Sequence, residues 1–387
     1  MNTVELDKAY VAGTYGRFPL ELVSGKGSIF VDDQGKEYID MGTGIGVTAF
    51  GTGDDAWVAA VTEQLGKLQH TSNLYFTSPC AKLAQQLCNR TGMKKVFFSN
   101  SGAEANECAI KVARKYSAET KGADYYTILT LENSFHGRTL TTLAATGQEH
   151  YHELFQPITP GFIHVPANDV QALEAAVAEN KIAGIMMEMV QGEGGVIALT
   201  EEFVQQAAAI CTQLDIPLIV DEEQTGNGRT GKLYAFQHYG ISPDLVSTAK
   251  GLGGGLPIGA TLMSEKVQDV LKPGDHGSTY GGNPVCCAGA LSIIERLTDD
   301  FLAEVAAKRA YIEQELTGAE GVEAVTGLGL MVGIKTTKPA GEVVTACREN
   351  GVLCLTAKDK VRLLPPLNIP MELLQKAVAV IKAACKQ

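Results

Sequence analysis

Three short motifs place reactive or anion-binding residue types directly after apolar stretches. Lys250 follows "LVSTA" and precedes the glycine-rich run "GLGGG", and Asp221 follows "IPLIV". The third motif, "SNSGAEANE" at 99–107, follows "KKVFF" and begins an amphipathic segment. Ligands of open α/β sheets bind at the carboxyl ends of the strands. We therefore expect the three motifs to lie around one site.

Each motif also has an ordinary structural explanation when it is taken alone. The segment 99–107 could be a tight strand-to-helix turn, Asp221 a capping residue, and Lys250 a solvated loop lysine. Functionally, small residues at a helix start let backbone N–H groups approach a phosphate. A carboxylate among apolar residues needs a cation or hydrogen bonds, and a lysine held away from solvent can act as an amine nucleophile.

The three motifs together match the requirements of one cofactor, pyridoxal 5'-phosphate. A lysine forms a Schiff base with its aldehyde, an aspartate keeps its pyridine nitrogen protonated, and a small-residue loop holds its phosphate. The motif at 99–107 is not a P-loop, and "GLGGGL" lacks the pattern of a dinucleotide fingerprint. The nine cysteines form no CxxC array, so we expect reduced thiols and no metal site.

An alternation of short apolar runs and amphipathic segments extends over residues 94–265. This pattern predicts a mostly parallel sheet covered by helices on both faces. The expected strands lie at 94–99, 125–132, 182–190, 216–224, 244–250 and 258–264. The expected helices begin at 102, at 170 and at 201.

The two ends of the chain differ from this centre. Residues 20–45 show a hairpin pattern with the turns "SGKG" and "DDQG", and residues 300–387 mix helices with short strands. We expect an N-terminal part of a small α+β domain at 1–50, a large cofactor-binding domain at 51–275, and the C-terminal part of the small domain at 276–387.

Composition and charge narrow the function class. The 387 residues carry a net charge of −12, which argues against a nucleic-acid-binding surface, because such a surface is basic. No apolar run is long enough to cross a membrane. The first residues, "MNTVELDKAY", resemble neither a signal nor a transit peptide. We therefore expect a cytoplasmic protein that has no nucleic-acid or membrane partner.

Beyond these motifs, the chain resembles the class III (ornithine-type) aminotransferases of pyridoxal-phosphate fold type I over essentially its whole length. Within that class the acetylornithine group is the most similar. The matching segments are "SNLYF", "SNSGAEANE", "SFHGRT", "VQGEGGV", "DEEQTGNGRTG", "AKGLGGGLPIGA", "GSTYGGNP" and "RLLPPL".

The resemblance implies the residues that hold the cofactor. Lys250 would be the Schiff-base lysine and the proton shuttle, and Asp221 would pair with the pyridine nitrogen. Gln224 would lie near the phenolic oxygen of the ring, and Phe135 would stack on one ring face. The segment Ser101, Gly102 and Ala103 would hold the phosphate. Thr279 would reach the phosphate of a neighbouring subunit, so a homodimer is expected.

The resemblance also implies how substrates are held. Arg362 would bind the α-carboxylate of glutamate and Arg138 its distal carboxylate, since arginine can meet a carboxylate with two hydrogen bonds. An acylornithine would place its carboxylate at Arg138, and Glu188 is expected to neutralise Arg362 at that stage. Tyr15 and Ser278 complete the expected substrate contacts.

Two positions depart from the family pattern. Glu223 stands where the family usually has Val or Ile against the ring, and Met189 replaces a common proline. A carboxylate at position 223 would need solvent, a proton or a cation, and it could change the properties of the cofactor.

The function expected from the resemblance is transfer of the δ-amino group of N-acetylornithine to 2-oxoglutarate, as part of arginine biosynthesis. Succinylornithine, ornithine, 4-aminobutyrate and a lysine-type amine are alternative donors of the same class. An aminomutase and a non-catalytic cofactor-binding protein are further alternatives.

Overall fold

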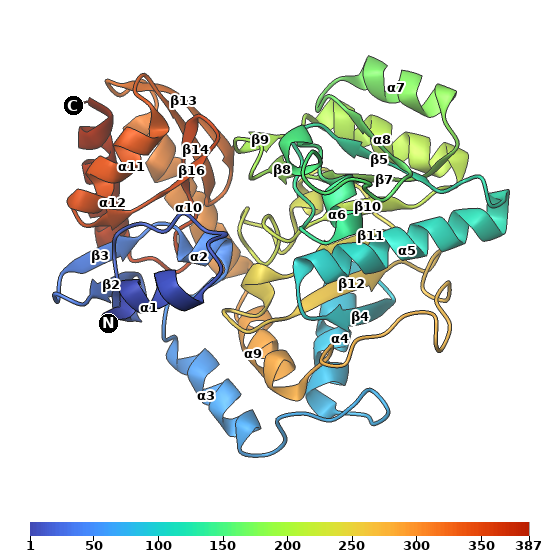
Figure 1. Ribbon diagram of the computed structural model, residues 1–387, viewed down its shortest axis with the longest axis horizontal. Coiled ribbons are helices and arrows are strands. Elements are labelled where there is room, and N and C mark those ends of the chain that lie inside the picture. The colour runs from blue at the N-terminus through green and yellow to red at the C-terminus, as the bar shows by residue number, and fades with distance from the viewer. Residues whose placement is uncertain (387) are drawn as a thin grey trace.

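The computed structural model describes residues 1–386, and its centre is a seven-stranded sheet (Figure 1). The strand order is β4-β12-β11-β10-β7-β5-β6. The strands from β11 to β6 are parallel, and β12 runs antiparallel to both of its neighbours. The predicted mostly parallel sheet is therefore confirmed. The strands are β4 (Lys95–Ser99), β5 (Thr127–Leu131), β6 (Phe162–Val165), β7 (Ile182–Glu188), β10 (Leu218–Asp221), β11 (Leu245–Thr248) and β12 (Gly259–Met263).

Helices cover both faces of this sheet, as the buried apolar strands require. Along β10, Leu218 and Val220 pack with the helices on one face, whereas Ile219 packs on the opposite face with α5 (Gly102–Lys121). Successive side chains of a strand point to opposite faces, so Asp221 lies on the same face as α5. The other face is covered by α8 (Glu201–Leu214) and α7 (Val170–Glu179) (Figure 1).

The two ends of the chain meet in a smaller unit beside the large sheet, where the N and C labels lie in Figure 1. Strand β15 (Val352–Leu353) from the C-terminal part pairs with β3 (Glu37–Asp40) from the N-terminal part. The expected small α+β unit built from both ends is thus observed. Its remaining strands are β1 (Leu22–Lys26), β2 (Ile29–Asp32), β13 (Val322–Leu328), β14 (Met331–Thr336), β16 (Leu355–Ala357) and β17 (Lys360–Leu363).

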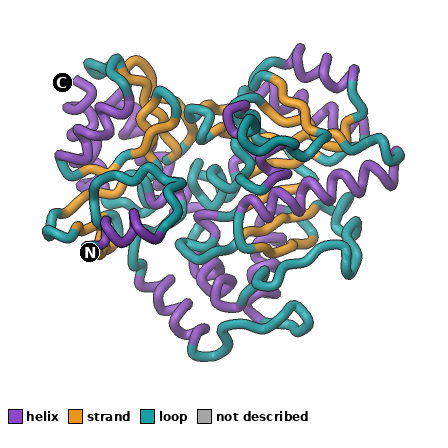
Figure 2. Tube along the Cα trace, in the orientation of Figure 1, coloured by secondary structure: helices purple, strands orange, loops and turns teal. Residues whose placement is uncertain are grey.

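The remaining helices connect and cover these sheets (Figure 2). Helix α9 (Pro284–Ile294) packs against α3 (Asp55–Leu65) and α4 (Ser78–Thr91). The expected domain limits at 50 and 275 stay a prediction. The other helices are α1 (Thr3–Tyr10), α2 (Thr43–Gly46), α6 (Leu140–Ala145), α10 (Asp299–Leu316), α11 (Ala340–Glu349) and α12 (Met371–Lys386).

Two features of the fold were not expected from the sequence. Strand β6 was missed, and the strand expected at 182–190 ends at Glu188. The chain then forms the small hairpin of β8 (Val190–Gln191) and β9 (Ile197–Ala198).

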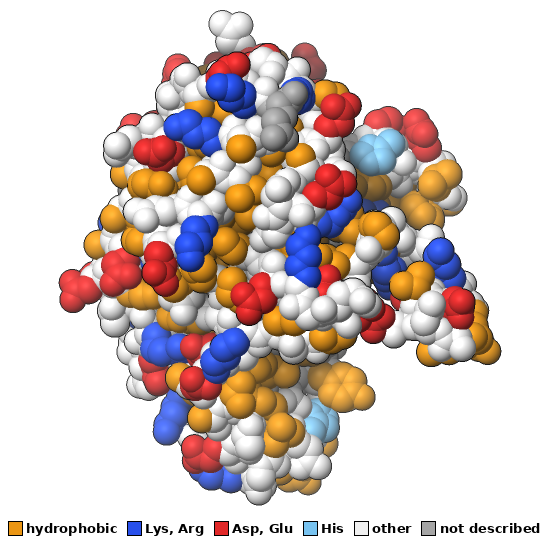
Figure 3. Space-filling model, turned by 90° about the vertical axis from the view of Figure 1, so that its left-hand side faces the viewer, with side chains coloured by type: hydrophobic (Ala, Val, Ile, Leu, Met, Phe, Trp, Pro, Cys, Tyr) orange, Lys and Arg blue, Asp and Glu red, His pale blue; other side chains and the backbone are white. Residues whose placement is uncertain are grey.

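The surface charges and the apolarity of the helices concern the expectation of no nucleic-acid or membrane partner. Acidic and basic side chains are interspersed over the face shown in Figure 3. Within residues 1–386, no helix is both long enough and apolar enough for a membrane crossing.

Candidate active site

Asp221 and Glu188 are neighbours at the carboxyl ends of two adjacent parallel strands. Asp221 is the last residue of β10 and lies in register with Glu188, the last residue of β7. Met186 of β7 packs on the α5 face and Met187 on the other, so the alternation places Glu188 on the α5 face, as it does Asp221. Both side chains are buried. Two carboxyl groups are therefore held side by side at the strand ends, on the face of the sheet that α5 covers.

Asp221 is held as a carboxylate by three hydrogen-bond donors. Asn106 Nδ2 and His136 Nδ1 each lie 2.8 Å from its Oδ2, and the backbone N–H of Glu223 donates to its Oδ1 at 3.0 Å. Burial alone would raise the pKa of Asp221, but the hydrogen bonds from His136, Glu223 and Asn106 outweigh it and hold the pKa below the usual value. Asp221 can therefore keep a protonated ring nitrogen as its partner.

Lys250 follows β11 at the next strand end, in an unusual backbone conformation. Its φ angle is 44°, in the left-handed region that is costly for a residue with a Cβ. Asn227 Nδ2 holds the preceding turn by donating to Thr248 Oγ1 at 3.0 Å and to the Ala249 carbonyl at 3.2 Å. Within residues 1–386 the ammonium group of Lys250 makes no hydrogen bond or ion pair with a side chain. The backbone that carries Lys250 is thus held in place, and its amine is left available.

The first turn of α5 is built of small residues that leave its backbone N–H groups accessible. Ser101 caps the helix by accepting from Glu104 N at 3.2 Å. A Cβ added to Gly102 would lie 1.8 Å from Glu223 Oε2, and one added to Gly259 would lie 2.2 Å from the Ser101 carbonyl oxygen. The backbone oxygen therefore requires glycine at position 259, whereas a Cβ at position 102 would displace the Glu223 carboxyl group. Ala103 follows in the same turn, so the segment predicted to hold the phosphate does form a helix N-terminus.

Phe135, Arg138 and Tyr151 form an aromatic and cationic edge of the site. The backbone N–H of Phe135 donates to Glu188 Oε2 at 3.1 Å. The Arg138 guanidinium lies 4.2 Å from the ring centroid of Tyr151 and 5.5 Å from that of Phe135. Its Nη2 also donates to the Tyr151 hydroxyl at 3.3 Å. Arg138 is exposed and has no carboxylate partner within residues 1–386, so it is free to bind an anion.

Arg362 is paired with Glu193 and not with Glu188, so the expected partner was wrong. Arg362 Nη1 lies 2.5 Å from Glu193 Oε1, and it also donates to Gln224 Oε1 at 3.3 Å. Glu188 ends β7 and accepts from the backbone N–H of Phe135, in the loop between β5 and α6. Glu193 lies five residues further on, in the turn of the β8–β9 hairpin. The hairpin reverses the chain and carries this second glutamate to the arginine.

Of the three remaining predicted contacts, Tyr15 and Thr279 are exposed, and Ser278 lies beside the start of α5. Tyr15 is 74% exposed and lies beside Arg17. Ser278 Oγ accepts from Asn100 Nδ2 at 3.1 Å, close to the start of α5. Thr279 follows it on an exposed loop. The roles expected for these three residues stay predictions.

Sequence reasoning did not assign roles to Asn106, His136 and Glu193, although all three lie within quoted motifs. Asn106 lies one turn below Gly102 on the inner face of α5, at a spacing that directs it toward the strand ends. His136 follows Phe135, and its Nε2 has no partner within residues 1–386. A search for polar side chains spaced four residues from Gly102 would have found Asn106.

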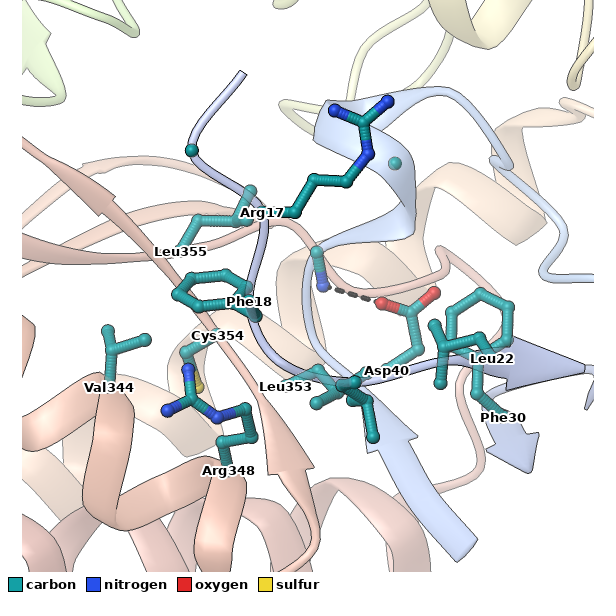
Figure 4. A pocket seen from close by; sticks show the side chains of 14 residues that line it. Arg17, Phe18, Leu22, Phe30, Asp40, Val344, Arg348, Leu353, Cys354 and Leu355 are labelled. Atoms are coloured by element: carbon teal, nitrogen blue, oxygen red, sulfur yellow. Dashed lines mark hydrogen bonds between the residues drawn. The ribbon is translucent and has the colours of Figure 1, made fainter. Parts of the chain in front are cut away.

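A mainly apolar pocket of about 420 Å³ lies elsewhere, between residues 16–22 and α11. Figure 4 shows Phe18, Leu355 and Arg348 around it, with Asp40 Oδ1 accepting from Gly42 N at 2.8 Å. None of the predicted site residues lines this pocket. It is therefore distinct from the centre described above.

The residues of this centre fit pyridoxal 5'-phosphate on the geometry alone. Asp221 accepts three hydrogen bonds at the end of β10, and Lys250 follows the neighbouring parallel strand β11. Glu223, two residues after Asp221, lies against Gly102 at the start of α5. Asp221 would hold the ring nitrogen, Lys250 the aldehyde carbon, and Ser101 to Ala103 the phosphate. The residues present therefore supply a partner for each polar part of the cofactor.

Comparisons with known proteins agree with this fit. The model of the family described as aminotransferase class-III matches residues 10–385. The chain is 49% identical to an acetylornithine aminotransferase of Haemophilus ducreyi over 97% of this chain and 96% of that protein. It is 44% identical to one of Methanocaldococcus jannaschii, over 96% and 94% of the two chains.

Solved structures show the same similarity. An ornithine aminotransferase from Toxoplasma gondii superposes with a TM-score of 0.93 at 32% identity, covering 99% of this chain and 93% of that one. An N-acetylornithine aminotransferase from Stenotrophomonas maltophilia superposes with a TM-score of 0.83 at 35% identity, covering 98% of each.

Proposed function

Because the chain belongs to the aminotransferase class-III family, a family of pyridoxal-phosphate enzymes, we propose that it transfers the δ-amino group of N-acetylornithine to 2-oxoglutarate. The products are N-acetylglutamate 5-semialdehyde and glutamate, and the reaction belongs to arginine biosynthesis. The names of the similar proteins support this choice of donor. Ornithine, succinylornithine, 4-aminobutyrate and lysine-type amines are the competing donors.

The unequal state of the two arginines is the observation that carries this proposal. Among residues 1–386, Arg138 has no acidic partner, whereas Arg362 is neutralised by Glu193. N-Acetylornithine has one carboxylate, and 2-oxoglutarate has two. Arg138 alone suffices for the first substrate, and both arginines are needed for the second. The site as it stands is therefore suited to the monoanionic donor.

Glu193 is placed to move aside when the dianionic acceptor enters. The Arg362 side chain is only 4% exposed, while the Glu193 side chain is 32% exposed. The carboxylate can thus turn toward solvent, and the arginine cannot follow it. A substrate carboxylate replaces one charge-assisted hydrogen bond by another, so the exchange leaves no buried charge without a partner.

The chemistry divides among the cofactor and the named side chains. When bound, pyridoxal 5'-phosphate takes up the amino group and stabilises the negative charge that develops on the donor carbon. Asp221 holds a proton on the ring nitrogen, because its own hydrogen bonds keep it ionised. Lys250 would hold the cofactor, and its free amine would move a proton at the donor carbon. Phe135 would stack on one face of the cofactor ring.

The second half of the proposal is that the protein acts in the cytoplasm as a homodimer. Several large apolar side chains are exposed on loops 72–76 and 277–283. Asn73 Nδ2 ties the two loops together by donating to the carbonyls of Ser278 and Gly281, at 3.0 and 2.9 Å. A contiguous exposed apolar patch typically marks a protein interface. The residues are Leu74, Tyr75, Phe76 and Tyr280.

A kinetic assay of the purified protein with its cofactor tests the proposal. We expect N-acetylornithine and 2-oxoglutarate to give glutamate, and we expect Lys250→Ala to give none. If another amine gave a higher kcat/KM than N-acetylornithine, that amine would take its place as the proposed donor. Turnover without 2-oxoglutarate would indicate an aminomutase, and a protein that binds the cofactor but reacts with no amine would be non-catalytic.

A further inference from the structure

The carboxyl group of Glu223 lies against Gly102 in the first turn of α5, the turn expected to hold the phosphate of the cofactor. Its Oε2 lies so close to Gly102 that a Cβ there would be 1.8 Å away, and its Oε1 accepts from Asn106 Nδ2 at 2.7 Å. A helix N-terminus favours a negative charge. Glu223 therefore lies beside the end of the helix that would attract an external anion.

Asn106 cannot satisfy both neighbouring carboxylates fully. Its Nδ2 lies within 2.8 Å of three acceptors: Asp221 Oδ2, Glu223 Oε1 and the His136 carbonyl. A side-chain amide has only two N–H hydrogens. Because Asp221 is also held by His136 Nδ1 and Glu223 N, it keeps its charge more easily than Glu223 does.

The charged groups around Glu223 decide its protonation state. Burial raises the pKa of Glu223 well above its usual value, and the charges of Asp221 and Glu188 raise it further. Lys250 is the one cation among the groups that affect it, and it lowers the pKa. Glu223 therefore keeps its proton to a higher pH than a solvent-exposed glutamate does.

We propose that Glu223 is an internal competitor of the cofactor phosphate at the N-terminus of α5. As a carboxylate it repels the phosphate dianion, and as a neutral acid it does not. The inference rests on the proposed function only in taking pyridoxal 5'-phosphate as the ligand. Glu223 is thus a positioning residue that makes cofactor affinity depend on pH.

The sign of this dependence follows from the linkage between binding and protonation. A bound phosphate favours the protonated form of Glu223, so cofactor binding takes up a proton wherever Glu223 is ionised in the free protein. The dissociation constant of the cofactor then rises with pH, by at most about tenfold per pH unit for one proton. Below the pKa of Glu223 in the free protein, the constant becomes flat.

Titration of cofactor-free protein with pyridoxal 5'-phosphate between pH 6 and 9 tests this inference. The fluorescence of the single tryptophan serves as the signal, because Trp57 Nε1 donates to the Gly253 carbonyl beside the Lys250 turn. Glu223→Gln removes the charge and keeps the shape. Glu119→Gln, at the far end of α5, makes the same change in net charge.

We expect Glu223→Gln to bind the cofactor about tenfold more tightly than the wild type at the upper end of this range, with a flatter pH profile. Glu119→Gln should follow the wild type. Pyridoxal, which lacks the phosphate, should bind both proteins alike. Superimposable profiles of wild type and Glu223→Gln, or an equal gain for pyridoxal, would overturn the inference.

A measurement on the wild type alone covers the case in which Glu223→Gln does not fold. Calorimetry in two buffers of different ionisation enthalpy counts the protons taken up on binding, and uptake that grows with pH is expected. No difference in uptake between the cofactor and pyridoxal would contradict the inference. A wild type that binds the cofactor with this proton uptake but transfers no amino group would overturn only the proposed function.

Discussion

Two parts of the candidate site hold their charges in opposite ways. The strand-end cluster (Glu188, Asp221 and Glu223) brings three carboxyl groups together, with Lys250 as the cation that lowers the pKa of Glu188 and Glu223. The arginine pair (Arg362 and Glu193) balances one cation with one anion. Carboxyl groups that lie too close together to ionise at once keep protons. In an ion pair the carboxylate carries no proton, and the arginine can exchange one carboxylate for another. pH should therefore control the cluster, and substrate charge should control the pair.

The largest expected effect comes from removing the ionised member of the strand-end cluster. Asp221→Asn keeps the size of the side chain but loses the charge that would hold a proton on the cofactor. We expect kcat/KM for N-acetylornithine to fall about 10²–10³-fold at saturating cofactor, the range seen when a single electrostatic contact of an active site is lost. A loss below tenfold would show that the charge of Asp221 is dispensable.

Asp221 and Glu222, the next residue along the chain, should contribute with opposite sign to the pH dependence of the free energy of unfolding. Glu222 is fully buried and accepts from Thr225 Oγ1 and from Phe236 N at 2.5 and 2.8 Å. Burial raises the pKa of Glu222 to about 7. The folded protein then binds more protons than the unfolded chain between about pH 4.5 and 7. The free energy of unfolding should therefore fall as pH rises through this range.

The contribution of Glu222 to this fall is of order 3 kcal/mol, since one pKa unit corresponds to about 1.4 kcal/mol. Chemical denaturation of wild type and Glu222→Gln at pH 5 and pH 7.5 measures it, and the variant should show the smaller difference. Asp221, with its lowered pKa, should affect stability only below about pH 4, where the sign is opposite. Equal pH differences for the two proteins would contradict the prediction.

Breaking the arginine pair should affect the acceptor more than the donor. With Arg362→Ala the second carboxylate of 2-oxoglutarate loses a charge-assisted contact of about 1.5–3 kcal/mol. We expect its KM to rise about 10- to 100-fold, while kcat/KM for N-acetylornithine changes by less than about threefold. Arg138→Ala is the matched comparison, because it should weaken both substrates. An equal loss for both substrates in Arg362→Ala would remove the distinction between the two arginines.

The smallest expected effect is a fall in the KM for 2-oxoglutarate, opposite to the rise expected for Arg362→Ala. Glu193→Gln leaves Arg362 without an anionic partner, so the acceptor no longer has to displace a carboxylate. We expect the KM for 2-oxoglutarate to fall about three- to tenfold, with the donor preference shifting toward amines that carry a second carboxylate. Steady-state kinetics with both substrates measures this. An unchanged KM would show that Glu193 does not compete with the acceptor.

The chain's local patterns were enough to predict the large sheet and the residues at its strand ends. Lys250, Asp221 and the segment 99–107 each follow a buried strand, and the apolar runs that form such strands are visible without any tertiary information. Motifs in the order of a known family then pointed to the class of enzyme, which the comparisons confirm. The contacts that decide the charge state of these groups were not predictable in the same way.

What the sequence determined by itself is which residues reach the strand ends, because alternation along a strand and the start of a helix depend on neighbours in the chain. Only the tertiary structure decided which charged side chains pair with one another. Arg362 could face Glu188 or Glu193, and the reversal of the chain at the β8–β9 hairpin selected Glu193. Asn106 joins Asp221 and Glu223 across more than a hundred residues. Hydrogen bonds and ion pairs depend on distances of about 3 Å, and such distances are set by packing between distant segments.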